Sequence, residues 1–153
     1  MVSADLLNTD GKVIGNVTVE QTTGGVLISA SATGVPAGEH GFHIHQTGIC
    51  DPATGFKSAG GHFAPEGHAH GFRDAAGPHG GDMPNQFAGD DGVMQASVFN
   101  PNVSLAIMMD EDGSALVIHA DPDDYVSQPS GAAGARLACA VIAAPKGKTA
   151  QGS

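Results

Sequence analysis

Short apolar runs separated by turn residues cover most of the chain, and this pattern predicts a β-rich fold. Asp-Gly, Gly-Gly and Asn-Pro-Asn sequences stand between the runs, as is typical of strands joined by tight turns. No helix is expected. We expect eight strands, at Val2–Leu7, Val13–Val19, Val26–Ala32, Gly41–His45, Val93–Phe99, Val103–Met109, Ala115–His119 and Leu137–Ala143.

Two long segments rich in glycine and proline interrupt this pattern. Regular structure is expected to stop from Cys50 to Asn85, and Ala120–Ala135 is expected to be a second long loop. Loops of this length in a compact chain are functional or disordered. The stretch from His62 to Asp82 holds four of the eight histidines. A metal ion, most naturally zinc, would order such a loop.

Composition supports an all-β sandwich or barrel. The chain has 153 residues, 23 of them glycine, and only 5% are aromatic, so we expect one domain over residues 1–153 with a frayed tail at 146–153. A formal net charge of −10 argues against binding nucleic acid or an anionic membrane surface. No apolar run approaches the roughly 20 residues of a membrane-spanning helix.

The compartment is only weakly indicated. No secretion signal precedes the first strand pattern, which begins at Val2, so we expect a cytosolic chain or a mature form whose leader was replaced by Met1. Cys50 and Cys139 are either two buried thiols or one disulfide. A disulfide would favour an oxidising compartment.

Histidines on one expected strand share a face. His43 and His45 are two residues apart, so their imidazoles project together while Phe42 and Ile44 face the core. His40 is out of phase with this pair, and we expect it to be a structural, hydrogen-bonded histidine at the start of the strand.

Two further histidines complete a possible four-nitrogen site. His119 ends the run A-L-V-I-H, and His62 opens the glycine-rich stretch. If both join His43 and His45, the site suits copper, zinc, iron or nickel, and a flattened arrangement favours Cu(II).

The remaining candidate ligands form a second set. His70, His79 and Asp82 together with one more histidine would make a closed zinc site. His62 lies between the two sets in sequence and is the candidate to serve both metals, one ring nitrogen for each. We expect His68 to be a spare loop histidine.

These motifs and their spacings resemble the copper/zinc superoxide dismutase family over essentially the whole chain. The matching segments are G-F-H-I-H at 41–45, G-H-F-x-P at 61–65, H-G at 70–71, H-x-x-D at 79–82, L-V-I-H at 116–119 and G-x-R-L-A-C at 134–139.

The resemblance implies an eight-stranded Greek-key β-barrel with an immunoglobulin-like strand arrangement and two long functional loops outside it. It implies disproportionation of superoxide to dioxygen and hydrogen peroxide, with one copper and one zinc ion per chain and His62 as the bridge. The implied copper ligands are His43, His45, His62 and His119, and the implied zinc ligands are His62, His70, His79 and Asp82.

Other family positions also match. The resemblance implies a Cys50–Cys139 disulfide and a carboxylate at Asp123 that links a copper histidine to a zinc histidine. It implies that Arg136 guides the anionic substrate, although an arginine there can also simply anchor a loop through carbonyl groups. Lys57 is a weaker candidate for guidance, and Asp124 is expected to be a solvated turn residue.

Several alternatives remain at this point. A copper carrier or metal buffer on the same fold would be expected to lose the bridging histidine or some copper ligands. A copper-only enzyme should lack the zinc ligands, and a structural domain would keep the barrel without the chemistry of either ligand set. The resemblance also leads us to expect a homodimer. We favour a periplasmic or otherwise extracytoplasmic location, and the cytoplasm stays open.

Overall fold

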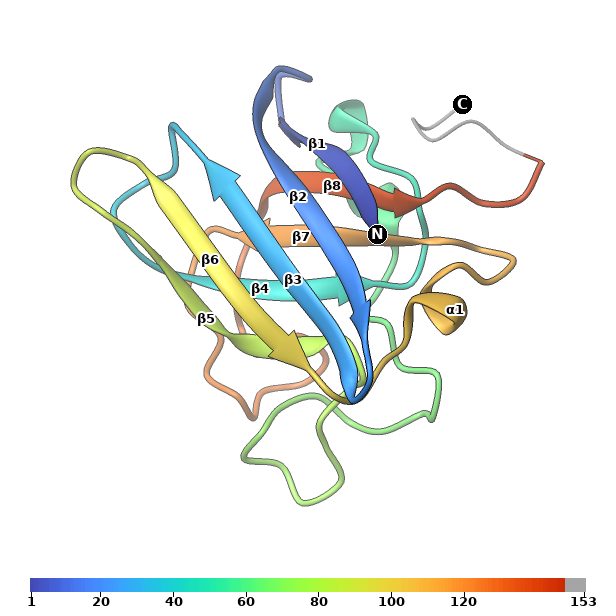
Figure 1. Ribbon diagram of the computed structural model, residues 1–153. Coiled ribbons are helices and arrows are strands. Elements are labelled where there is room, and N and C mark those ends of the chain that lie inside the picture. The colour runs from blue at the N-terminus through green and yellow to red at the C-terminus, as the bar shows by residue number, and fades with distance from the viewer. Residues whose placement is uncertain (148–153) are drawn as a thin grey trace.

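A computed structural model describes residues 1–147 as a closed antiparallel β-barrel (Figure 1). Around the barrel the strands follow the order β1-β2-β3-β6-β5-β4-β7-β8, and β1 closes on β8. The chain crosses over between β3 and β4 and between β6 and β7, so the expected eight-stranded Greek-key barrel is confirmed. The strands are β1 Val2–Asn8, β2 Val13–Thr22, β3 Gly25–Ala32, β4 Gly38–His45, β5 Asp82–Ala88, β6 Met94–Asn100, β7 Ser114–His119 and β8 Arg136–Ala143.

One expected strand is wrong. The run Val103–Met109 instead contains the single-turn helix α1, Leu105–Met108. The Ser104 hydroxyl accepts a hydrogen bond from the Ile107 amide and caps the turn, as serine at a helix N-terminus commonly does. The turn buries Met108, so this apolar run contributes to the core without pairing into the sheet.

The strand that the sequence did not reveal is β5, because it contains Pro84. Proline cannot donate to a strand ladder and is tolerated at bulges. The pairing of β4 with β5 shifts between His40 and Phe42, so Pro84 lies in a β-bulge of β5, opposite Gly41. Pairing of β5 with β6 is limited to Ala88 and Met94.

Side chains alternate across the strands as the sequence predicts. Phe42 and Ile44 of β4 lie in the main core inside the barrel, and both are fully buried, which is worth about 1.5–3 kcal/mol for each. A second apolar cluster packs Phe56 and Ala59 from the first long loop against the outer face of β7. That loop contains the short 3-10 segments η1, Pro52–Thr54, and η2, Lys57–Ala59.

Two long loops leave this barrel. The first, residues 46–81, runs in teal and green from β4 to β5, and the second, residues 120–135, joins β7 to β8 (Figure 1). Among residues 1–147, no helix has both the length and the apolar character needed to cross a membrane. Most of the tail expected to fray, 146–153, lies outside the described residues.

The Cys50–Cys139 disulfide is present and joins the first long loop to β8. The two cysteines are 89 residues apart in sequence. In the chain-entropy model, closing a loop of that length contributes about 4–5 kcal/mol.

Candidate metal centre

Strand geometry brings four histidines together on the outside of the barrel. His43 and His45 project from β4 on the face opposite the core, and β4 pairs with β7, which ends at His119. An isolated bridge places His62 beside His45. Ligand atoms of these four residues all lie within 4.8 Å of one another. We call them the four-histidine group.

The ring nitrogens of this group that face one another are free to bind a metal ion. His45 Nδ1 lies 2.8 Å from the Gly60 carbonyl oxygen, and His119 Nδ1 lies 3.3 Å from the Gly134 carbonyl oxygen. Carbonyl oxygens only accept, so both Nδ1 atoms carry the proton and both Nε2 atoms present lone pairs. These two Nε2 atoms are 3.2 Å apart.

His43 and His62 supply the other two lone pairs. His43 turns Nε2 to Asp123 Oδ2 at 2.7 Å, which leaves Nδ1 buried without a hydrogen-bond partner. His62 Nε2 is likewise buried and unpartnered. Each such orphaned atom costs about 1–3 kcal/mol, and a metal ion bound by both would remove the penalty. The donor set therefore fits a copper ion.

A second convergence lies on the other side of the His62 ring. His62 Nδ1 is 3.2 Å from His70 Nδ1, 3.3 Å from His79 Nδ1 and 2.9 Å from Asp82 Oδ1. Asp82 Oδ1 is also 2.9 Å from His70 Nδ1 and 3.4 Å from His79 Nδ1. A tetrahedral zinc ion with bonds of about 2.0–2.1 Å needs ligand atoms about 3.3 Å apart, and these separations match. We call these four residues the aspartate group.

One compact cluster of potential ligands differs in one member from this aspartate group. His62, His70 and Asp82 also cluster with His43, all four being buried. His43 directs Nε2 to Asp123 and not to Asp82, so its free nitrogen belongs with the four-histidine group. His79 is the better fourth member, because its Nδ1 lies within hydrogen-bond distance of His62 Nδ1.

Two aspartates orient the imidazoles. Asp82 Oδ2 accepts hydrogen bonds from the backbone amides of Gly71 and His79, both at 2.9 Å. Asp123 connects the two groups, since its Oδ1 lies 2.8 Å from His70 Nε2 and its Oδ2 lies 2.7 Å from His43 Nε2. Although burial opposes it, these bonds hold the pKa of each carboxyl well below its ordinary value.

The imidazoles of the two groups differ in protonation. Burial lowers the pKa of His119 to about 3 and that of His62 to about 4, and it lowers the pKa of His45 strongly. Burial opposes protonation of His70 too, but its hydrogen bonds to Asp123 and Asp82 raise the pKa to about 9. Copper-type ligation needs neutral imidazoles, and the four-histidine group supplies them at neutral pH.

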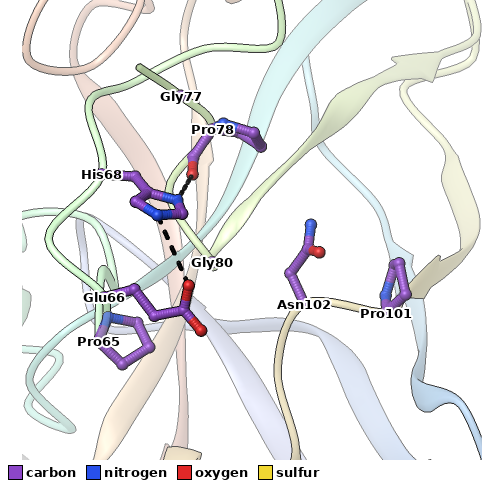
Figure 2. A pocket seen from close by; sticks show the side chains of 8 residues that line it. All are labelled: Pro65, Glu66, His68, Gly77, Pro78, Gly80, Pro101 and Asn102. Atoms are coloured by element: carbon purple, nitrogen blue, oxygen red, sulfur yellow. Dashed lines mark hydrogen bonds and ion pairs between the residues drawn. The ribbon is translucent and has the colours of Figure 1, made fainter. Parts of the chain in front are cut away.

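His40 and His68 lie where the sequence suggested. The His40 ring nitrogens lie 2.7 Å from the His119 carbonyl and 2.6 Å from the Pro36 carbonyl, so its structural role is confirmed. His68 faces a surface hollow of about 290 Å³ with its Nδ1 3.2 Å from the Pro78 carbonyl and its Nε2 3.6 Å from Glu66 (Figure 2).

Of the two candidate guiding cations, Arg136 lies beside the four-histidine group. Arg136 is the first residue of β8, pairs with His119 in the sheet and donates from Nη1 to the Phe56 carbonyl at 2.7 Å. It therefore anchors a loop, and its charge also contributes to the lowered pKa of His45 and His119. Lys57 is exposed and follows Phe56. Asp124 is exposed and caps its own turn, as expected.

Sequence reasoning missed two residues that brace the site. The Asn85 side chain accepts from the Asp123 amide at 2.8 Å and donates to the Asp123 carbonyl at 2.9 Å. Gln128 makes the same two-bond pairing with the main chain of His70. Asparagine and glutamine in loops are common, so no sequence signal marked either one.

Known proteins resemble the chain in sequence and in fold. The family model for copper/zinc superoxide dismutase matches residues 13–142. Copper–zinc superoxide dismutase 2 of Aquifex aeolicus is 50% identical over 145 residues, covering 91% of this chain and 84% of the relative. The copper–zinc superoxide dismutase of Caulobacter vibrioides is 42% identical over 140 residues, covering 87% and 80%.

Solved structures agree with this. A superoxide dismutase-like protein from Bacillus subtilis matches with a TM-score of 0.87 at 38% identity, covering 93% of this chain and 98% of that one. The copper/zinc superoxide dismutase from Brucella abortus matches with a TM-score of 0.77 at 28% identity, covering 92% and 97%. With two ligand clusters that suit one copper and one zinc ion, this chain belongs to the copper/zinc superoxide dismutase family.

Proposed function

We propose that the protein is a superoxide dismutase that converts two superoxide anions and two protons to dioxygen and hydrogen peroxide. One observation carries the proposal: two buried nitrogens, His43 Nδ1 and His62 Nε2, have no hydrogen-bond partner and point into the four-histidine group. A copper carrier or buffer would not need the same histidine ring to face two metal sites.

In this proposal each group holds one ion. Copper held by the four-histidine group would supply one-electron redox chemistry between two superoxide anions. Zinc in the aspartate group would fix the first long loop and the basicity of His62. Copper is assigned to His43, His45, His62 and His119, and zinc to His62, His70, His79 and Asp82.

The residues of the chain then have distinct tasks. His62 spans both groups, with Nε2 toward the four histidines and Nδ1 toward Asp82, and so is placed to hold a proton at Nε2 and deliver it to the second substrate anion. Arg136 attracts that anion, because its charge is already felt at His45 and His119. Local positive charge of this kind can steer an anion to an acidic protein.

The experiment is superoxide consumption by the metal-loaded protein before and after copper is removed. We expect activity that depends on copper and returns when copper is restored. Arg136→Ala should slow turnover and weaken inhibition by anions while copper stays bound, and Lys57→Ala should do less. Activity without any dependence on copper would refute the proposal, and kinetics of Arg136→Ala that match the unsubstituted protein at every ionic strength would refute steering.

For assembly and compartment we propose a homodimer and a periplasmic or other extracytoplasmic location. The disulfide supports the compartment, because such bonds persist in oxidising environments. Family resemblance supports the dimer. The exposed phenylalanines Phe87 on β5 and Phe99 on β6 offer apolar surface outside the metal centre. Sedimentation of the full chain and of a Phe87→Ser variant tests both the dimer and this surface.

A further inference from the structure

The two long loops are joined directly by contacts between residues 70–74 and residues 123–128, which we call the interloop clasp. The Arg73 amide donates to the Tyr125 carbonyl at 2.9 Å. The ring of Phe72 lies 5.4 Å from that of Tyr125, and the Arg73 guanidinium lies over the same tyrosine ring. These contacts involve no metal ligand side chain, so they can form before any ion binds.

Gln128 contributes two hydrogen bonds to the clasp, both to the main chain of His70. Its Oε1 accepts from the His70 amide at 2.9 Å, and its Nε2 donates to the His70 carbonyl at 2.8 Å. Both main-chain polar groups of His70 are thereby satisfied by one side chain. His70 is fully buried, and a buried main-chain group left without a partner costs about 1–3 kcal/mol.

The backbone of both segments of the clasp has little conformational freedom. Tyr125 has φ +69, a left-handed conformation that costs a non-glycine residue about 1–2 kcal/mol. Hydrogen bonds from its amide to Asp123 Oδ1 at 2.7 Å and from the Asn85 amide to its hydroxyl at 2.9 Å hold it there. Its carbonyl passes so close to Gly71 that a Cβ at that glycine would lie 1.9 Å from it.

His70 contacts two other members of the aspartate group. Its Nδ1 lies 3.2 Å from His62 Nδ1 and 2.9 Å from Asp82 Oδ1, while Nε2 is held by Asp123. The carboxylates fix how the ring is turned, and Asp82 also accepts a hydrogen bond from the next main-chain amide, that of Gly71. From the second loop, the Gln128 side chain bonds directly to the main-chain amide and carbonyl of His70.

We propose that Gln128 is a positioning residue for zinc: its side-chain amide fixes the main chain of His70 and so places Nδ1 among the other three ligand atoms. The second long loop thereby preorganises the zinc site of the first. This inference rests on the zinc role proposed above for His70. Partners that orient a metal ligand typically change metal affinity by about 10–100-fold when they are removed.

The test is zinc affinity of the metal-free full chain, measured with Zn²⁺ in competition with a chromophoric chelator. Gln128→Leu replaces the amide with an apolar, branched side chain one atom shorter and removes both hydrogen bonds, and we expect affinity to fall by about 10–100-fold. Gln128→Glu keeps an acceptor for the His70 amide and loses the donor to the His70 carbonyl. Its zinc affinity should therefore lie between those of the unsubstituted protein and Gln128→Leu. Ser127→Ala is the matched control in the same loop, since the Ser127 hydroxyl contacts only Asp124 among the described residues, and it should bind zinc normally.

Hydrogen exchange of the His70 amide in the metal-free protein separates positioning from general destabilisation. Exchange should accelerate in Gln128→Leu, while far-ultraviolet circular dichroism and exchange in the barrel strands stay unchanged. Zinc binding by both Gln128 variants at the affinity of the unsubstituted protein would overturn the inference, as would a Gln128→Glu affinity below that of Gln128→Leu.

A parallel His70→Ala variant distinguishes the two proposals. If His70→Ala loses zinc and the Gln128 variants keep it, the zinc assignment stands and the positioning role of Gln128 falls. If His70→Ala binds zinc normally, the zinc assignment itself is wrong.

Discussion

The four-histidine group takes three ligands from barrel strands, whereas the aspartate group takes three from the first long loop. On β4, the two-residue repeat alone aligns His43 with His45. Beside the loop, Asp82 at the start of β5 must accept hydrogen bonds from two backbone amides and contact three imidazoles to gather the same number of ligands. A ligand set on strands thus depends on the register of the sheet, while a set on a loop depends on the polar side chains that brace it.

The two groups also differ in charge. The described ligands of the four-histidine group are all imidazoles, and burial lowers the pKa of each one. In the aspartate group a carboxylate is itself a ligand, and the pKa of His70 is raised to about 9. The first group therefore offers neutral nitrogens, and the second holds a proton that a zinc ion must displace.

The largest expected effect comes from removing a strand ligand. His119→Ala should reduce superoxide consumption to that of the copper-free protein, because one of four copper-facing nitrogens is lost. Zinc content should be unchanged, since His119 contacts no member of the aspartate group other than the shared His62. Metal analysis and the activity assay check this, and parallel loss of zinc would mean that the two groups are not separate ligand sets.

A smaller effect is expected where the groups are linked. Asp123→Ala should weaken zinc binding by about 10–100-fold, because His70 and His43 each lose the acceptor that orients the ring. Copper affinity should fall less, since His45 and His119 keep their own carbonyl partners. Chelator competition for each ion measures the difference. Equal losses for both ions would show that Asp123 braces the two groups to the same degree.

The pH dependence of stability should separate the groups in the metal-free protein. In the unfolded chain His62 and His119 bind a proton below pH 6.5, whereas in the folded protein their pKa values are about 4 and about 3. The unfolded state therefore binds more protons in this range, and the free energy of unfolding falls as pH falls. The pKa of His70 in the folded protein is about 9. Its contribution to the free energy of unfolding is therefore fully present below pH 6.5 and is lost as pH rises toward 9.

Denaturant unfolding across pH 4–9 should therefore give a maximum near pH 6.5. His119→Gln should flatten the acid side, and His70→Gln should remove the alkaline decline. An alkaline decline that persists in His70→Gln would contradict the assignment of that limb.

The smallest effect is expected at His68. Its side chain is half exposed and faces Glu66 and the Pro78 carbonyl, so His68→Ala should leave zinc and copper content unchanged. His70→Ala, two residues away, should lose zinc. Metal analysis of the two variants side by side tests the assignment of this loop, and loss of zinc in His68→Ala alone would reverse it.

Much of the barrel could be predicted, and the failures have physical causes. Seven strands follow from alternating apolar residues between turn signals. Val103–Met109 has the same composition, but the Ser104 cap and the buried Met108 favour one helical turn. Pro84 concealed β5, since proline is tolerated in a strand at a bulge, and this bulge exists only once β4 and β5 are paired.

The sequence by itself supplied the candidate ligand residues, because a two-residue repeat on a strand and a family-specific set of spacings can be read directly from the chain. It also supplied His62 as the residue shared by the two sets. Tertiary structure decided which ring nitrogen faces which ion, since that depends on carbonyls and carboxylates distant in sequence, such as Gly60, Gly134 and Asp123. It alone revealed Asn85 and Gln128, whose amides act only where one loop folds against another part of the protein.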